Sequence, residues 1–159
     1  MKVSSSGIKN GYYLDKYGKY GSSKEDVSIP VEIEDAPKGT ICFALILDDA
    51  DAIPVCGQTF IHWTIADFKG TRLTDNSSLT DKSLIQGVSS LYDLGGESQV
   101  KASCYCGMSP PDKDHTYELR VYALAQLTNL KPGFLVKDLY QKMEGHILGM
   151  ATLRAKYRK

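Results

Sequence analysis

The sequence contains no apolar run that approaches the roughly 20 residues needed to span a membrane, and this predicts no integral membrane association. It also lacks net charge, because 19 Lys and Arg residues balance 19 Asp and Glu residues. A basic surface that would attract nucleic acid is therefore not expected. The N-terminal stretch MKVSSSGIKNGYY lacks the apolar centre of a signal peptide, so we expect a cytoplasmic location.

Cysteine is scarce, and its spacing does not favour a metal site. Cys42 lies within an apolar run and Cys56 stands alone, whereas Cys104 and Cys106 form a C-x-C pair. Zinc sites generally use longer spacings and a second pair of ligands. We therefore expect neither a metal nor another cofactor. The sequence also has no G-x-S-x-G elbow, H-E-x-x-H helix or phosphate-binding loop, so it offers no recognised catalytic motif.

The composition that is present is typical of a globular protein. The chain has 159 residues, of which 42% are apolar and 24% are charged. This length predicts one domain over residues 1–159 with a sizeable core. Residues 1–26 are rich in Gly, Ser, Tyr and Lys. This composition predicts an N-terminal segment that wraps around the domain.

A continuous apolar segment from Ile41 to Leu47 predicts a central β-strand. The carboxylates of Asp48, Asp49 and Asp51 follow it directly. An unpaired charge is costly to bury, so these residues form either a solvated turn or a binding site.

Residues 27–34 precede that strand and alternate between apolar and other residues, which predicts a half-buried strand. Pro30 has no N–H to donate to a neighbouring strand, and this favours an edge position. The side chains expected to face inward are those of Val27, Ile29, Val31 and Ile33.

A strand with a histidine follows the acidic loop, at residues 60–65. Strict alternation places His62 on one face with Phe60 and Thr64, and Trp63 on the opposite face. A lone strand histidine is commonly a core or surface residue. Its position directly after a carboxylate loop favours a functional role.

A second histidine begins the strand predicted for residues 115–124. Alternation places His115 and Tyr117 on the face that continues into the apolar Leu119. Residues 89–109, between the two histidine strands, form a long irregular loop, and loops of this length are often functional.

The C-terminal part of the chain predicts a helix and a last strand. Leu135, Leu139 and Met143 recur at helical spacing, and Gly145 is a suitable residue to end the helix. Residues 148–157 predict the last strand. The complete pattern predicts a mainly β fold with a C-terminal helix.

Five polar side chains stand out because they lie at two junctions between a loop and a strand. If the strands are neighbours, these side chains surround one small pocket, which suits an oxyanion such as phosphate. The same groups could instead bind a metal as a His/His/Asp set, or act as acid and base in hydrolysis. The five residues are Asp49, Asp51, His62, His115 and Tyr117.

Three motifs, in this order, resemble those of the phosphatidylethanolamine-binding protein family. The family typically carries D-P-D-A-P, then W-x-H or H-H, then G-x-x-P-P followed by H-R-Y. The similarity covers roughly residues 20–158 and is greatest to the bacterial and archaeal branch, the YbhB/YbcL or Raf-kinase-inhibitor-like type. The matching segments here are Asp49–Ile53, Ile61–Trp63, Gly107–Pro111 and His115–Tyr117.

The resemblance implies an antiparallel β-sandwich with a small anion pocket at one end. It implies that phosphate-like or carboxylate anions, including phospholipid headgroups, are the ligands. Eukaryotic members inhibit kinases or proteases, so a protein partner is implied, and bacterial relatives are often dimers, so we expect a homodimer. The implied pocket residues are Asp49, His62, His115 and Tyr117, with Asp51 and Pro111 in support.

Three residues depart from the family pattern. Ala50 stands where proline is usual, Ile53 stands near the second proline, and Thr116 replaces the arginine of H-R-Y. Our leading hypothesis is a non-enzymatic small-anion-binding protein that regulates a partner. The alternatives are a small hydrolase or lyase that uses His62 and Asp49, and an interaction domain whose pocket is vestigial.

Overall fold

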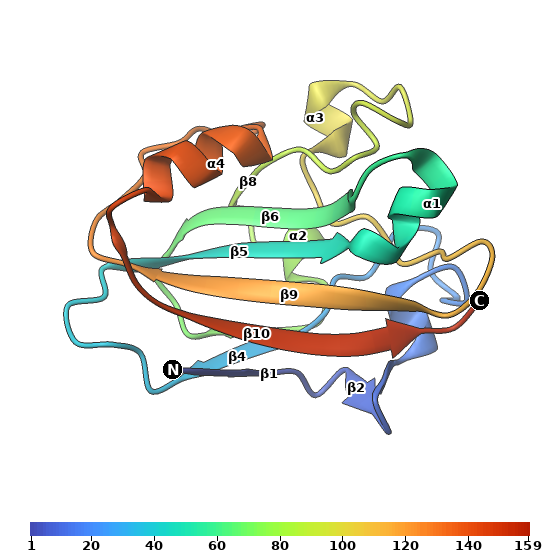
Figure 1. The fold of residues 1–159 in the computed structure, drawn as a ribbon, viewed down its shortest axis with the longest axis horizontal. Helices are drawn as coiled ribbons and strands as arrows, with labels where there is room; N and C mark the ends of the chain where they lie inside the picture. The colour runs from blue at the N-terminus through green and yellow to red at the C-terminus, as the bar shows by residue number, and fades with distance from the viewer.

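Two β-sheets pack face to face in the computed structural model, which describes residues 1–159 (Figure 1). The smaller sheet has the order β1-β4-β7, with β1 at Lys2–Ser4, β4 at Val31–Glu34 and β7 at Arg72–Leu73. The larger sheet has the order β2-β3-β10-β9-β5-β6-β8. Its strands are β2 (Ile8–Lys9), β3 (Tyr12–Tyr13), β5 (Cys42–Asp49), β6 (Phe60–Phe68), β8 (Ile85–Gln86), β9 (His115–Leu124) and β10 (Ile147–Tyr157).

Every neighbouring pair of strands is antiparallel except β3 and β10. Strand β5 lies between β9 and β6, which confirms the prediction of a central strand. The mainly β class is confirmed as well.

Strand β5 is buried on both faces, and this explains its continuous apolar sequence. Phe43 and Leu45 point into the core between the two sheets. Ala44 and Ile46 point to the opposite face, where they join a second apolar cluster with Leu139 of helix α4 (Val136–Met143). The burial of both faces fixes the strand, and with it the carboxylates at its end.

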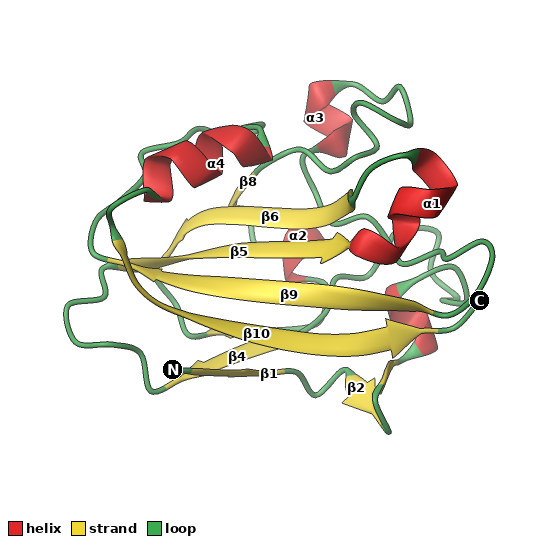
Figure 2. Ribbon diagram, in the orientation of Figure 1, coloured by secondary structure: helices red, strands yellow, loops and turns green.

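The predicted C-terminal helix is α4, which packs over one end of the outer face of the larger sheet (Figure 2). Gly145 follows it with φ of 77°, a left-handed conformation that glycine adopts without strain. No helix combines the length and the apolar character required to cross a bilayer. The remaining helical turns are α1 (Ile53–Cys56), α2 (Ser77–Thr80), α3 (Gln99–Ala102), η1 (Asp15–Tyr17) and η2 (Ala50–Ala52).

The prediction that residues 27–34 form an edge strand is wrong. Strand β4 begins only at Val31, after Pro30, and lies in the middle of the smaller sheet between β1 and β7. Pro30 therefore removes no hydrogen bond from the interior of the strand. The partner that makes β4 central is β1, a three-residue strand within the N-terminal segment.

The predicted alternation around His62 is also wrong in part. Trp63 lies opposite Leu47 and Ile61 lies opposite Asp48, so His62 is an extra residue at a β-bulge. A bulge re-aims the side chains that follow it. As a result, His62 packs on the same side as Tyr117, while the next residue, Trp63, also enters the core between the sheets.

Candidate functional site

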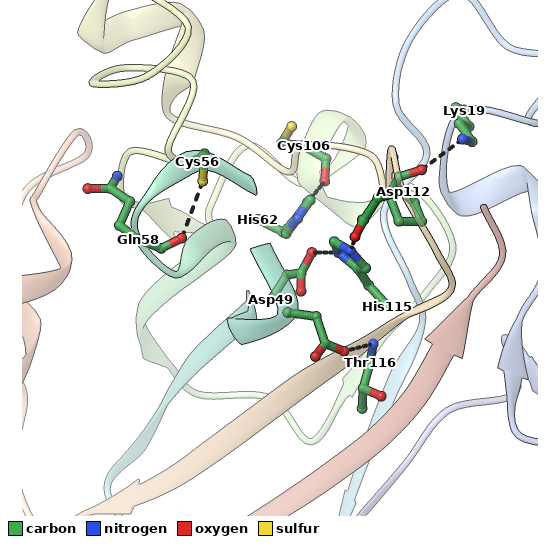
Figure 3. A network of polar contacts seen from close by, with 11 residues as sticks. Lys19, Asp49, Cys56, Gln58, His62, Cys106, Asp112, His115 and Thr116 are labelled. Atoms are coloured by element: carbon green, nitrogen blue, oxygen red, sulfur yellow. Dashed lines mark hydrogen bonds and ion pairs between the residues drawn. The ribbon is translucent and has the colours of Figure 1, made fainter. Parts of the chain in front are cut away.

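A cavity of about 300 Å³ opens where β5 ends and where β6 and β9 begin (Figure 3). The strand register brings these ends together, because Asp49 lies opposite both Phe60 and Tyr117. The cavity lining is Asp49, Ala52, Val55, Cys56, Phe60, His62, Leu91, Cys106, Gly107, Ser109, Pro111, His115 and Tyr117. Four candidate pocket residues and Pro111 therefore meet in one place.

His115 is held between two carboxylates. Its Nδ1 is 2.7 Å from Asp49 Oδ2, and its Nε2 is 2.7 Å from Asp112 Oδ1 (Figure 3). Burial alone would lower the pKa of His115, but the two carboxylates outweigh burial and raise it. Both ring nitrogens then carry hydrogen, and each donates to one carboxylate.

His62 is held by backbone instead. Its Nδ1 donates to the carbonyl oxygen of Cys106 at 2.8 Å, and the amide of Cys106 donates to the His62 carbonyl at 2.8 Å. The ring packs against Phe60 and Tyr117, with centroids 4.7 and 5.0 Å away. Burial lowers the pKa of His62, which favours the neutral ring. With Nδ1 protonated, Nε2 presents a lone pair.

Two further groups complete the polar surface of the cavity. Asp49 Oδ1 is buried and accepts no hydrogen bond, although Oδ2 of the same carboxylate is bound to His115. Burial raises the pKa of Tyr117, so its phenol is neutral and able to donate. Because an unpartnered buried oxygen is costly, Asp49 Oδ1 is a natural acceptor for a ligand.

Asp51 does not line the cavity. Its carboxylate accepts a hydrogen bond from the backbone amide of Thr116 at 2.9 Å. The bond ties helical turn η2 to the start of β9, directly beside His115. The geometry thus gives Asp51 a supporting position.

The long loop at residues 89–109 forms one wall of the cavity, through Leu91, Cys106, Gly107 and Ser109. It is anchored to the start of β6, because the Ser90 amide donates to the carbonyl of Ile61. A functional role was predicted for this loop from its length. Gly107 and Ser109 belong to the motif segment Gly107–Pro111, whereas nothing in the sequence marks Leu91 or Cys106 as a lining residue.

Asp112, the second carboxylate at His115, was not predicted from the sequence. It lies in the turn before β9 and contacts His115 three residues later. The available signal was its spacing of three residues from a histidine, within a stretch that also contains Asp114. That spacing does not by itself specify a contact in a non-helical turn.

Comparisons with known proteins give one consistent result. A sequence model of the family described as phosphatidylethanolamine-binding protein matches residues 4–158. The uncharacterized protein YxkA of Bacillus subtilis is 43% identical over 155 residues, which cover 91% of this chain and 92% of YxkA. A UPF0098 protein of the archaeon Methanothermobacter thermautotrophicus is 33% identical over 147 residues, covering 89% of each chain.

Solved structures agree with the sequence comparisons. A putative phosphatidylethanolamine-binding protein homologue from Chlamydia trachomatis superposes with a TM-score of 0.83 at 26% identity, covering 99% of this chain and 97% of that one. YbcL from E. coli, described as a member of the mammalian family, superposes with a TM-score of 0.79 at 21% identity. That match covers 99% of this chain and 98% of YbcL, and it supports the fold.

Proposed function

The chain belongs to the phosphatidylethanolamine-binding protein family, and from this premise we propose that its cavity binds a small phosphorylated anion. The observation that carries the proposal is the meeting of two buried histidines, His62 and His115, in one cavity of about 300 Å³. A cavity of this size accommodates phosphate or a phosphomonoester headgroup rather than a large ligand.

The donors and acceptors of the cavity favour a phosphate that keeps one proton. The cationic ring of His115 and the phenol of Tyr117 supply donors to phosphate oxygens. The Nε2 lone pair of His62 and the free oxygen of Asp49 are acceptors, and they suit a P–OH group or an ammonium. A ligand that both accepts and donates therefore matches the cavity better than a fully ionised phosphate.

Calorimetry with inorganic phosphate and with phosphoethanolamine at pH 7 tests the proposal. We expect saturable binding by the wild-type chain, and a loss of at least about tenfold in affinity in His115→Ala, because a charged donor is removed. His146→Ala is the matched control, since His146 follows α4 and lies outside the cavity. Equal affinity of wild type and His115→Ala would contradict the pocket assignment.

We further propose that the protein is non-enzymatic and regulates a partner protein. The support is helix α1, which exposes Ile53 and Val55, because Val55 also lines the cavity. Exposed apolar side chains next to a ligand site favour a partner whose docking responds to the ligand.

A small hydrolase or lyase is the second candidate, and the buried pair of Asp49 and His115 favours it. A carboxylate that orients an imidazole is a common arrangement of catalytic bases. His62, the base first considered, contacts the Cys106 carbonyl rather than Asp49. A phosphatase and esterase screen across pH distinguishes the two candidates. Turnover that His62→Ala or His115→Ala abolishes would favour the enzyme.

A further inference from the structure

The two carboxylates that hold His115 differ sharply in their freedom to move. Asp49 is at the end of a central strand, and its side chain is only 4% exposed. Asp112 is in the turn before β9, and its side chain is 50% exposed. A rotamer change can therefore carry the Asp112 carboxylate into water, whereas Asp49 is fixed by the strand and by its burial.

The His115 ring has no free N–H group that could bind a ligand. Its side chain is 1% exposed, and both nitrogens are already bound to carboxylates at 2.7 Å. An anion that uses this ring as a donor must take the place of one carboxylate. Asp112 is the one that can be replaced, because its side chain is half-exposed and it directly follows Pro111, which lines the cavity, whereas Asp112 itself lies outside the lining.

The charges lead to the same conclusion. With His62 neutral, the charged groups here are the His115 cation and the carboxylates of Asp49 and Asp112. While Asp112 is bound to His115, the site therefore carries a net negative charge. An incoming phosphate would be repelled by Asp112 as well as excluded by it. Moving Asp112 into solvent removes both obstacles and leaves the Nε2–H of His115 free.

We propose that Asp112 competes with the ligand: its carboxylate accepts the Nε2–H of His115 from the half-exposed turn before β9, and a bound anion displaces it. The proposal rests on the anion-binding function proposed above and adds a residue that determines affinity and selectivity. The apparent affinity equals the intrinsic affinity multiplied by the fraction of molecules in which Asp112 has left His115. If that fraction is about one in ten, the loss is about tenfold.

Selectivity follows from the same competition. A ligand with a single carboxylate, such as acetate, offers His115 nothing that Asp112 does not already offer within the same molecule. A phosphate has further oxygens, which reach Tyr117 and the acceptors Asp49 and His62. The competitor therefore favours phosphate-like ligands over simple carboxylates.

Two variants separate the charge of Asp112 from its ability to accept a hydrogen bond from His115. Asp112→Asn removes the charge but keeps an oxygen that can accept from His115, whereas Asp112→Ala removes both. The matched control is Asp114→Asn in the same turn. Asp114 binds the Tyr12 hydroxyl at 2.9 Å and the Lys159 amide at 3.0 Å, away from the cavity. The control changes the net charge by the same amount as Asp112→Asn.

Calorimetry with inorganic phosphate and with acetate at pH 7, at one ionic strength, is the experiment. We expect phosphate to bind Asp112→Ala about tenfold more tightly than wild type, Asp112→Asn by an intermediate factor, and Asp114→Asn as wild type does. We also expect the preference for phosphate over acetate to shrink in Asp112→Ala. The His115 ring signals in NMR, recorded without phosphate, should shift in Asp112→Ala and not in Asp114→Asn.

The remaining outcomes each overturn the inference. If Asp112→Ala binds phosphate no better than wild type while His115→Ala loses binding, Asp112 is no competitor and the proposed anion site stands. If Asp114→Asn tightens binding as much as Asp112→Asn, the effect is one of overall charge. If neither wild type nor Asp112→Ala binds phosphate, the inference and the proposed function fail together.

Discussion

His62 and His115 share one cavity, yet their pKa values move in opposite directions from the ordinary value of about 6.5. Burial dominates at His62 and lowers its pKa. Two carboxylates outweigh burial at His115 and raise its pKa. We therefore expect an NMR pH titration of the ring signals to place the midpoint of His115 above 6.5 and that of His62 below it. Two midpoints on the same side of 6.5 would contradict this account of the site.

The same shifts predict how stability depends on pH. The raised pKa of His115 contributes stability that is fully present below about pH 6.5 and is lost as pH rises through the folded pKa. The lowered pKa of His62 acts in the opposite way, since its contribution is present above about pH 6.5 and is lost as pH falls through the folded pKa.

Of the two histidines, only His115 therefore contributes to the pH dependence of stability above about pH 6.5. We expect the free energy of unfolding in urea to fall between pH 6.5 and pH 8 in wild type, and to change less in His115→Gln, which has no ring to deprotonate. His146→Gln should follow wild type. An equal pH dependence in wild type and His115→Gln would show that the deprotonation of His115 does not cause the loss of stability.

Four of the residues that line the candidate site were predicted from the sequence, but their contacts were not. Asp49, His62, His115 and Tyr117 line the cavity as the motifs suggested. The partner of each ring could not be predicted. The hydrogen bond that His115 donates to Asp112 depends on the path of a turn. The orientation of His62 depends on a β-bulge, which a strictly alternating pattern does not predict.

Among the elements, the loop wall of the cavity includes one close approach, between Gly107 and Asp26. The Gly107 amide donates to the Asp26 carboxylate at 2.7 Å, and a Cβ on Gly107 would lie 2.6 Å from Asp26 Oδ1. We expect Gly107→Ala to destabilise the protein by about 1–3 kcal/mol through overpacking.

A double-mutant cycle in urea checks this cause. In an Asp26→Ala background the opposing oxygens are gone, so Gly107→Ala should cost clearly less than it does in wild type. An equal cost in both backgrounds would show that Asp26 is not what excludes the Cβ.

Elements with a strong local pattern were predictable, and weakly patterned ones were not. Strands β5 and β9 and helix α4 follow from an apolar run, an alternation and a helical spacing. Strand β1 has three residues, two of them polar, and gains its stability from pairing with β4. Because that pairing is non-local, the sequence of β1 did not reveal that β4 is a central strand.

At the scale of the whole molecule, the association state stays a prediction. We expect a homodimer, and the N-terminal tyrosines bear on it in different ways. Tyr13 and Tyr17 are buried in the core, whereas Tyr12 and Tyr20 are partly exposed. Sedimentation equilibrium at micromolar concentration measures the mass directly. A mass of 17.5 kDa at every concentration would contradict the dimer.

The central claim is that His62 and His115 form one anion pocket. The measurement that tests it most directly is an NMR titration of the imidazole signals with phosphate and with phosphoethanolamine, at pH 6 and at pH 8. We predict saturable shifts of both rings with a single dissociation constant, and tighter binding at pH 6, where His115 is more fully charged. Absence of shifts in both rings at both pH values would contradict the claim.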